Sequence, residues 1–150
     1  MHAPRGFIGI AVIVAMLGPW AAGKALALTE GKTAQDEPYI SGGIGLDERE
    51  ALDKQRAGYS LWVATAAKKF GSYVADARIV ISDAAGNVVL DARLDGPWLL
   101  VNLKPGRYDA SASFGGQTQR KTTTVHAGDH HELLFYFDLE AETLPPDAKE

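Results

Sequence analysis

The pattern of apolar and polar positions changes part-way along the chain. From Tyr59 onward, apolar residues recur at every second position, in short runs separated by glycine, proline and aspartate. A period of two is typical of β-strands that bury one face. The runs predict seven strands, at residues 59–66, 73–82, 88–95, 98–103, 107–114, 117–125 and 131–137. Short, evenly spaced strands without intervening helices predict an all-β fold, a seven-stranded antiparallel sandwich.

A single helix is predicted ahead of these strands, over residues 47–57. Asp47 is the expected N-cap, acidic residues occupy the first turn, basic residues occupy the last turn, and Gly58 ends the helix. Its apolar face is thin, so we expect it to rest on the sandwich. The glycine-rich segment 39–45 before it is either a short edge strand or a loop with unusual backbone angles.

The N-terminus has the organisation of a secretory signal peptide, predicted over residues 1–27. A short basic start precedes the uncharged stretch 6–23, and Ala25-Leu26-Ala27 provides small residues for cleavage near Ala27. The alternative is an uncleaved membrane anchor. Gly18-Pro19 interrupts the apolar stretch and favours cleavage. We therefore expect a periplasmic or secreted protein that meets the membrane only through this segment, before cleavage.

Composition limits what the remaining chain does. Residues 28–38 are polar and predict a flexible leader, residues 39–138 form one domain, and residues 139–150 predict a disordered acidic tail. The chain has no cysteine, so its core must stabilise it without disulfides. Loss of the two basic residues of the signal peptide from 15 leaves 13 basic and 19 acidic residues, a net charge of −6. This charge disfavours nucleic acid as a partner.

Several turn motifs lie at characteristic places between the predicted strands. They are Asp83…Gly86, Asp95-Gly96, Leu103-Lys-Pro-Gly-Arg-Tyr108, Phe114-Gly-Gly116 and Ala127-Gly128. With these motifs, residues 78–138 resemble the carboxypeptidase regulatory-like domain, a transthyretin-like (prealbumin-like) β-sandwich. The whole arrangement is similar to small exported proteobacterial proteins of unassigned activity. The resemblance implies a module that binds, packs or braces, and no peptidase domain accompanies it.

Three aromatic residues are the candidates for partner binding. Trp62, Trp98 and Tyr136 fall on the outward phase of their strands. Such residues either lie beneath the helix or form an exposed apolar patch that marks a partner site. We favour cover by the helix, because the helix needs an apolar surface to rest on. The leading hypothesis is a non-enzymatic periplasmic module that binds an envelope protein or a cell-surface component, without a cofactor.

Histidines give a second hypothesis, a periplasmic protein that binds copper or zinc. His126, His130 and His131 lie around one turn, and imidazoles are ligands for both metals. Neighbouring residues on a strand point to opposite faces, which works against joint ligation by His130 and His131. A hydrolase is the third class considered, but no triad pattern surrounds Ser111 or Ser113. We therefore expect no catalytic residues.

Overall fold

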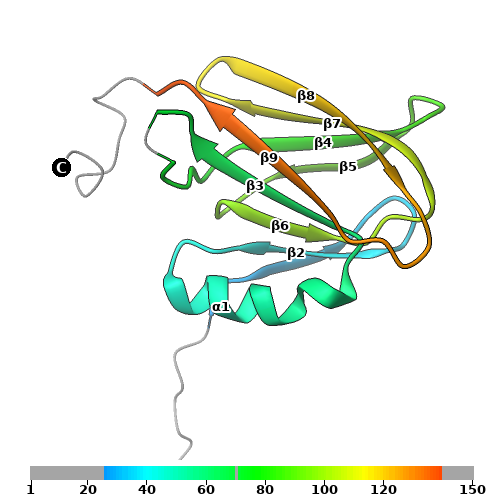
Figure 1. Cartoon of the computed structure of the whole chain (residues 1–150), viewed down its shortest axis with the longest axis horizontal. Coiled ribbons are helices and arrows are strands. Elements are labelled where there is room, and N and C mark those ends of the chain that lie inside the picture. The colour runs from blue at the N-terminus through cyan, green and yellow to red at the C-terminus, as the bar shows by residue number, and fades with distance from the viewer. Residues whose placement is uncertain (1–25, 70, 140–150) are drawn as a thin grey trace, which may run out of the picture.

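The protein is a sandwich of two β-sheets with one short helix on the outside, as the computed structural model shows (Figure 1). The structure describes residues 26–69 and 71–139. The predicted signal peptide, except for residues 26 and 27, lies outside this part of the chain, and so does the predicted tail beyond Leu139. The two sheets and the short helix confirm the coarse prediction of an all-β sandwich.

The structure has nine strands in its described part, with a helix and a 3₁₀ turn between the second and third strands. In chain order the elements are β1 (Thr29–Lys32), β2 (Pro38–Gly42), α1 (Leu46–Gln55), η1 (Arg56–Gly58), β3 (Leu61–Ala67), β4 (Arg78–Asp83), β5 (Val88–Arg93), β6 (Trp98–Val101), β7 (Gly106–Phe114), β8 (Gln117–Val125) and β9 (His131–Phe137). The seven predicted strands correspond to β3–β9. The predicted strand at 73–82 is too long, because regular pairing starts only at Arg78.

The strands form a five-stranded sheet, in the order β1-β2-β6-β3-β9, and a four-stranded sheet, in the order β5-β4-β7-β8. Most neighbours are antiparallel. The prediction of a wholly antiparallel sandwich is wrong at one place, because β3 and β9 run parallel, with Leu61 opposite His131 and Ala67 opposite Phe137. These strands are far apart in sequence, so no tight turn constrains their relative direction.

Two strands beyond the seven predicted ones lie at the N-terminal edge of the larger sheet: β1, which was not predicted, and β2, which falls on the segment expected to be an edge strand or a loop. Thr29 of β1 pairs with Ser41 of β2, and Ile40 of β2 pairs with Leu100 of β6. The prediction of a flexible leader over residues 28–38 is therefore wrong. An outer edge strand is held by backbone hydrogen bonds and faces water, so it needs little apolar sequence.

The main core lies between the two sheets. Its fully buried members include Leu61, Val63, Ile79, Ile81, Leu94, Leu99, Phe135 and Phe137. At one end of the core, the hydroxyl of buried Tyr108 donates to the backbone carbonyl of Lys104, at an O···O distance of 2.6 Å. This bond closes the Pro-Gly turn before β7 and satisfies a polar group that burial would otherwise penalise.

Contacts between α1 and the preceding loop fix the start of the helix. Gly45 is the N-cap, so the prediction that Asp47 caps the helix is wrong. The Glu48 carboxylate instead accepts hydrogen bonds from the N–H groups of Gly43 and Ile44. Gly43 has a φ of 96°, in the left-handed region that favours glycine. The segment 39–45 therefore combines both predicted states, since β2 is a strand and a glycine turn follows it.

Candidate functional site

The outer face of the five-stranded sheet carries large apolar side chains in register across its strands. Paired residues of neighbouring strands project to the same face. One row runs Leu100–Trp62–Glu132, the next runs Trp98–Ala64–Leu134, and the third runs Tyr73–Ala66–Tyr136. The middle member of each row belongs to β3. Because Ala64 and Ala66 are small, the larger side chains on either side pack over β3.

The helix covers only part of this face. Leu52, the one buried residue of α1, packs in a cluster with Ile40, Leu100 and Trp98. Figure 1 shows α1 lying along β2 and β6, away from β9. Cover by the helix therefore explains the burial of Trp98, which is only 8% exposed. Trp98 is a core residue, and the prediction that it contacts a partner is not supported by this position.

The rest of the face remains open to solvent. We call the four side chains Trp62, Tyr73, Leu134 and Tyr136 the aromatic face. Tyr73 is 43% exposed and Tyr136 is 41% exposed, while Trp62 and Leu134 are half-buried. Two of the three predicted aromatic residues, Trp62 and Tyr136, thus lie on one surface.

Aromatic rings and two arginines form a continuous series across this surface. The Trp62 and Trp98 ring centroids are 5.0 Å apart, and those of Trp98 and Tyr73 are 5.7 Å apart, both in edge-to-face geometry. Arg56 lies 4.2 Å from the Trp62 ring centre and Arg49 lies 5.5 Å from that of Tyr73. Each ring that ends the series therefore carries a cation–π contact with a helix arginine.

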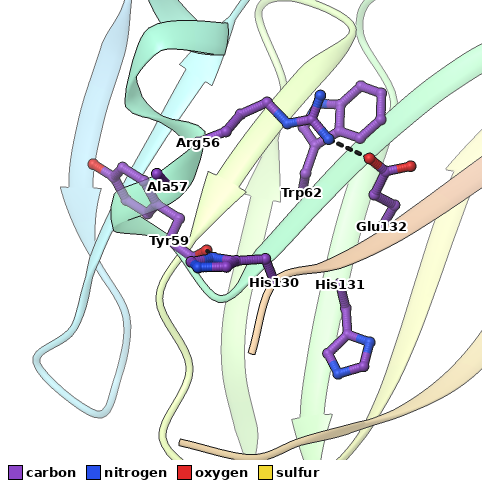
Figure 2. A pocket seen from close by; sticks show the side chains of 7 residues that line it. All are labelled: Arg56, Ala57, Tyr59, Trp62, His130, His131 and Glu132. Atoms are coloured by element: carbon purple, nitrogen blue, oxygen red, sulfur yellow. Dashed lines mark hydrogen bonds and ion pairs between the residues drawn. The ribbon is translucent and has the colours of Figure 1, made fainter. Parts of the chain in front are cut away.

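A depression of about 250 Å³ lies at the Arg56 end of the series. Figure 2 shows the Arg56 guanidinium against Trp62, with the Glu132 carboxylate bonded to it. Arg56 also bonds Asp53, at an N···O distance of 3.3 Å. On the other side lies Tyr59, and burial, with a smaller contribution from the charge of Glu30, raises the pKa of its hydroxyl.

Both indole N–H groups of the series, those of Trp62 and Trp98, are buried and have no hydrogen-bond partner within the described residues. An unpaired buried donor costs on the order of 1–3 kcal/mol. The two unpaired donors therefore carry a cost that aliphatic side chains at these positions would not have.

The three histidines of the metal hypothesis do not converge. Nδ1 of His130 bonds the carbonyl oxygen of Tyr59 at 2.8 Å, and Nε2 of His131 bonds Asp129 at 3.0 Å. Figure 2 shows the His131 ring directed away from Trp62. Across residues 26–69 and 71–139, no group of three or more His, Cys, Asp or Glu side chains is arranged to hold a metal ion.

Asp129 instead organises the turn between β8 and β9. Its carboxylate accepts a hydrogen bond from the backbone N–H of His126, at an O···N distance of 2.8 Å. This bond, with a second contribution from the His131 side chain, lowers the pKa of Asp129 below its ordinary value. The negative charge therefore stabilises the turn from which β9 begins.

The sequence pattern missed three members of the site, namely Arg49, Arg56 and Tyr73. The spacing of the arginines gives a signal that could have found the first two. Residues seven apart lie on one side of a helix, so this spacing would have placed Arg49 and Arg56 on the same side. Tyr73 lies outside every regular strand and reaches the face through one isolated bridge with Ala66. No sequence period indicates such a position.

A scan against protein-family models gives no match, and a search of the curated proteins gives none either. No helix among the described residues has the length and apolar content needed to span a membrane.

Proposed function

We propose that this protein is a non-enzymatic β-sandwich module of the periplasm or the secreted fraction, and that it binds another protein or an envelope component. Its binding surface is the aromatic face, with Arg49 and Arg56 at the rim. The observation that carries the proposal is that α1 covers one end of the outer sheet face and leaves Tyr73 and Tyr136 exposed at the other.

The composition of this surface supports a binding role. Tyrosine, tryptophan and arginine are the residues most enriched at the energetic centres of protein interfaces. Tyr73 and Tyr136 offer large rings with few rotatable bonds, so ordering them in a complex costs little entropy. Arg49 and Arg56 are already held by contacts to the Tyr73 and Trp62 rings. The surface is thus pre-organised for a partner.

The family that we propose is the carboxypeptidase regulatory-like domain, with a prealbumin-like sandwich. Two features support it: the Pro-Gly turn that precedes β7, and Tyr108, whose hydroxyl bonds back to that turn. We propose export through cleavage of residues 1–27, from the organisation of the N-terminal sequence. An exported module with a net negative charge suits a protein partner better than nucleic acid.

In-cell crosslinking tests the proposed function. A photo-crosslinking amino acid is placed at Tyr136 and, in a second strain, at Val88. Val88 is the control because it is apolar, is 52% exposed and belongs to the other sheet. We expect one defined adduct from position 136 and none from position 88, identified by mass spectrometry. Equal recovery from both positions, or recovery of the uncrosslinked protein alone, would contradict the proposal.

A further inference from the structure

The geometry of β9 suggests how a partner reaches the aromatic face. β9 is the last strand of the five-stranded sheet, so only one side of it is paired, with β3. Along a parallel strand, successive residues direct their backbone groups alternately toward and away from the neighbour. The N–H of His131 bonds Ser60 and the carbonyl of Phe137 bonds Lys68, both on the β3 side. The even-numbered residues of β9 therefore direct their backbone groups outward.

Two glutamines of β8 occupy half of that outward edge. The Gln119 side chain bonds both the N–H and the carbonyl of Tyr136, and the Gln117 side chain does the same at Asp138. A side-chain amide with one donor and one acceptor thus takes the place of a neighbouring strand. It prevents another chain from pairing at these two positions.

The other half of the edge lacks this protection. The next two outward-facing residues are Leu134 and Glu132, and within the described part of the chain no side chain bonds their N–H or carbonyl groups. The β8 residue that follows Gln119 on the same phase is Lys121, whose ammonium lies 5.7 Å from the Phe135 ring centre. A lysine offers no acceptor for a backbone N–H, so the glutamine pattern stops there.

We propose that an extended segment of the partner adds to β9 as a further strand, by pairing with Leu134 and Glu132. This inference rests on the proposed function and specifies its binding mode. Backbone pairing at these positions extends the rows of the outer face. The side chain paired with Leu134 continues the apolar row of Trp98 and Ala64, and it lies against the aromatic face.

The neighbouring charges define the chemistry of that segment. Beside Leu134 the partner needs an apolar side chain. Beside Glu132 it needs a basic one, because Arg56 bonds one carboxylate oxygen and leaves the other as an acceptor. The residue between them points the other way, toward Lys121, which has no acidic partner among the described residues, and an acidic side chain fits there. The segment therefore carries apolar, acidic and basic residues in succession, in either chain direction.

A library of random heptapeptides displayed on phage tests the proposal. The library is selected on the purified protein and, in parallel, on Leu134→Pro and Leu134→Ala variants. The proline removes an N–H that faces away from β3, so the ladder with β3 is kept. Alanine keeps the N–H and loses only the side chain. We expect peptides with the apolar–acidic–basic pattern that bind the wild type, bind the Leu134→Ala variant more weakly because it lacks the apolar side chain, and do not bind the Leu134→Pro variant.

Methylation of the peptide backbone gives a readout that does not depend on the proline variant. Each residue of a selected peptide is N-methylated in turn. Strand addition predicts that affinity falls by about tenfold at every second residue and is unchanged between them, since only alternate N–H groups bond β9. A uniform effect, or none, would overturn the proposal even if the proline variant did not fold.

The remaining outcomes separate this inference from the proposed function. Peptides that lose binding in a Tyr136→Ala variant but keep it in Leu134→Pro would retain the aromatic face as a binding surface and overturn strand addition. Strand addition would also be overturned if no peptide were enriched on the wild type relative to the Leu134→Pro variant. Crosslinking from Tyr136 tests the proposed function independently of this selection. A wild-type dimer that Leu134→Pro abolishes would identify a second copy as the strand and overturn the peptide partner.

Discussion

The Arg56 guanidinium stacks on the Trp62 ring, with its central carbon 4.2 Å from the ring centre. The contact joins the end of the helix to β3, the strand next to the edge strand β9 of the larger sheet. The Arg56 side chain is only 31% exposed and is also bonded by Glu132. Stacking with a partly desolvated guanidinium contributes on the order of 1 kcal/mol.

Replacement of Arg56 therefore tests this junction. We expect Arg56→Ala to lower the free energy of unfolding by about 1 kcal/mol and to shift tryptophan emission to longer wavelength, because Trp62 becomes more exposed. Urea unfolding monitored by fluorescence measures both effects. Arg107→Ala, on an exposed position of β7, is the matched control. An equal effect of the two substitutions would show that the stacking contributes nothing.

Leu52 anchors the helix. It is fully buried and is the one buried residue of α1. We expect Leu52→Ala to lower the free energy of unfolding by about 2–5 kcal/mol, since it removes buried volume beneath the helix. Leu46→Ala, in the same helix but at a position that is 66% exposed, should change it by less than about 0.5 kcal/mol. Thermal unfolding followed by circular dichroism compares the two, and similar losses would contradict this account of how α1 is held.

The hydroxyl of Tyr108 should stabilise the fold through its hydrogen bond to the Lys104 carbonyl, in addition to the burial of the ring. Tyr108→Phe keeps the ring and leaves the Lys104 carbonyl without its donor. We expect a loss of about 1 kcal/mol in the free energy of unfolding, measured by chemical denaturation. Tyr136→Phe removes a hydroxyl from an exposed ring and should cause no measurable change. The prediction fails if both phenylalanine variants are equally stable.

The glutamine contacts of β9 can be tested by amide hydrogen exchange. Gln119→Ala removes the acceptor for the Tyr136 N–H, so this amide should exchange at least about tenfold faster than in the wild type. The effect should be confined to the neighbourhood of Tyr136. Arg120→Ala, one position along β8, serves as the control and should leave the Tyr136 amide unchanged. Fast exchange of this amide already in the wild type would show that the contact is not maintained in solution.

Asp129 should make stability depend on pH in the acid range. Its pKa is lowered in the folded state from an ordinary value of 3.8, chiefly by the His126 N–H. A carboxyl group whose pKa is lowered by folding stabilises the folded state at pH values above its pKa in the unfolded chain. This stabilisation is lost as the pH falls through its pKa in the folded protein. Asp129→Asn should therefore destabilise the protein near pH 7, and the difference from the wild type should shrink below about pH 3.5. The urea midpoints of Asp129→Asn and the wild type are compared near pH 7 and below about pH 3.5. A difference between the two proteins that stays the same at both pH values would contradict the prediction.

The strand pattern was predictable where burial alternates along the chain. Period-two alternation located β3–β9, because each of these strands packs at least one face on the core. It could not locate β1, whose exposed residues carry no such alternation and whose position depends on pairing with β2. The parallel pairing of β3 with β9 was equally inaccessible, since direction in a distant pair is decided by the whole chain path.

The candidate site was predictable only in part, for a related reason. Trp98 and Tyr136 share one phase and therefore one face, as the sequence indicates. Their burial differs because α1 lies along β2 and β6, away from β9, and the position of a helix on a sheet depends on tertiary contacts. The clamp of Glu48 and Arg49 on the Gly43–Ile44 turn sets that position. None of its contacts follows from periodicity.

The parallel pairing of β3 with β9 also bears on how the molecule acquires its fold. The strand that completes the larger sheet, β9, is synthesised after the other eight described strands, and its neighbour β3 is synthesised much earlier. Pairing between such distant segments is slow, because a long stretch of chain must be ordered first. Until His131–Phe137 is available, β3 presents an unsatisfied edge and the Phe135 and Phe137 positions of the core are empty. The larger sheet is therefore expected to remain incomplete, and the core between the sheets unfilled, until residues 131–137 have emerged.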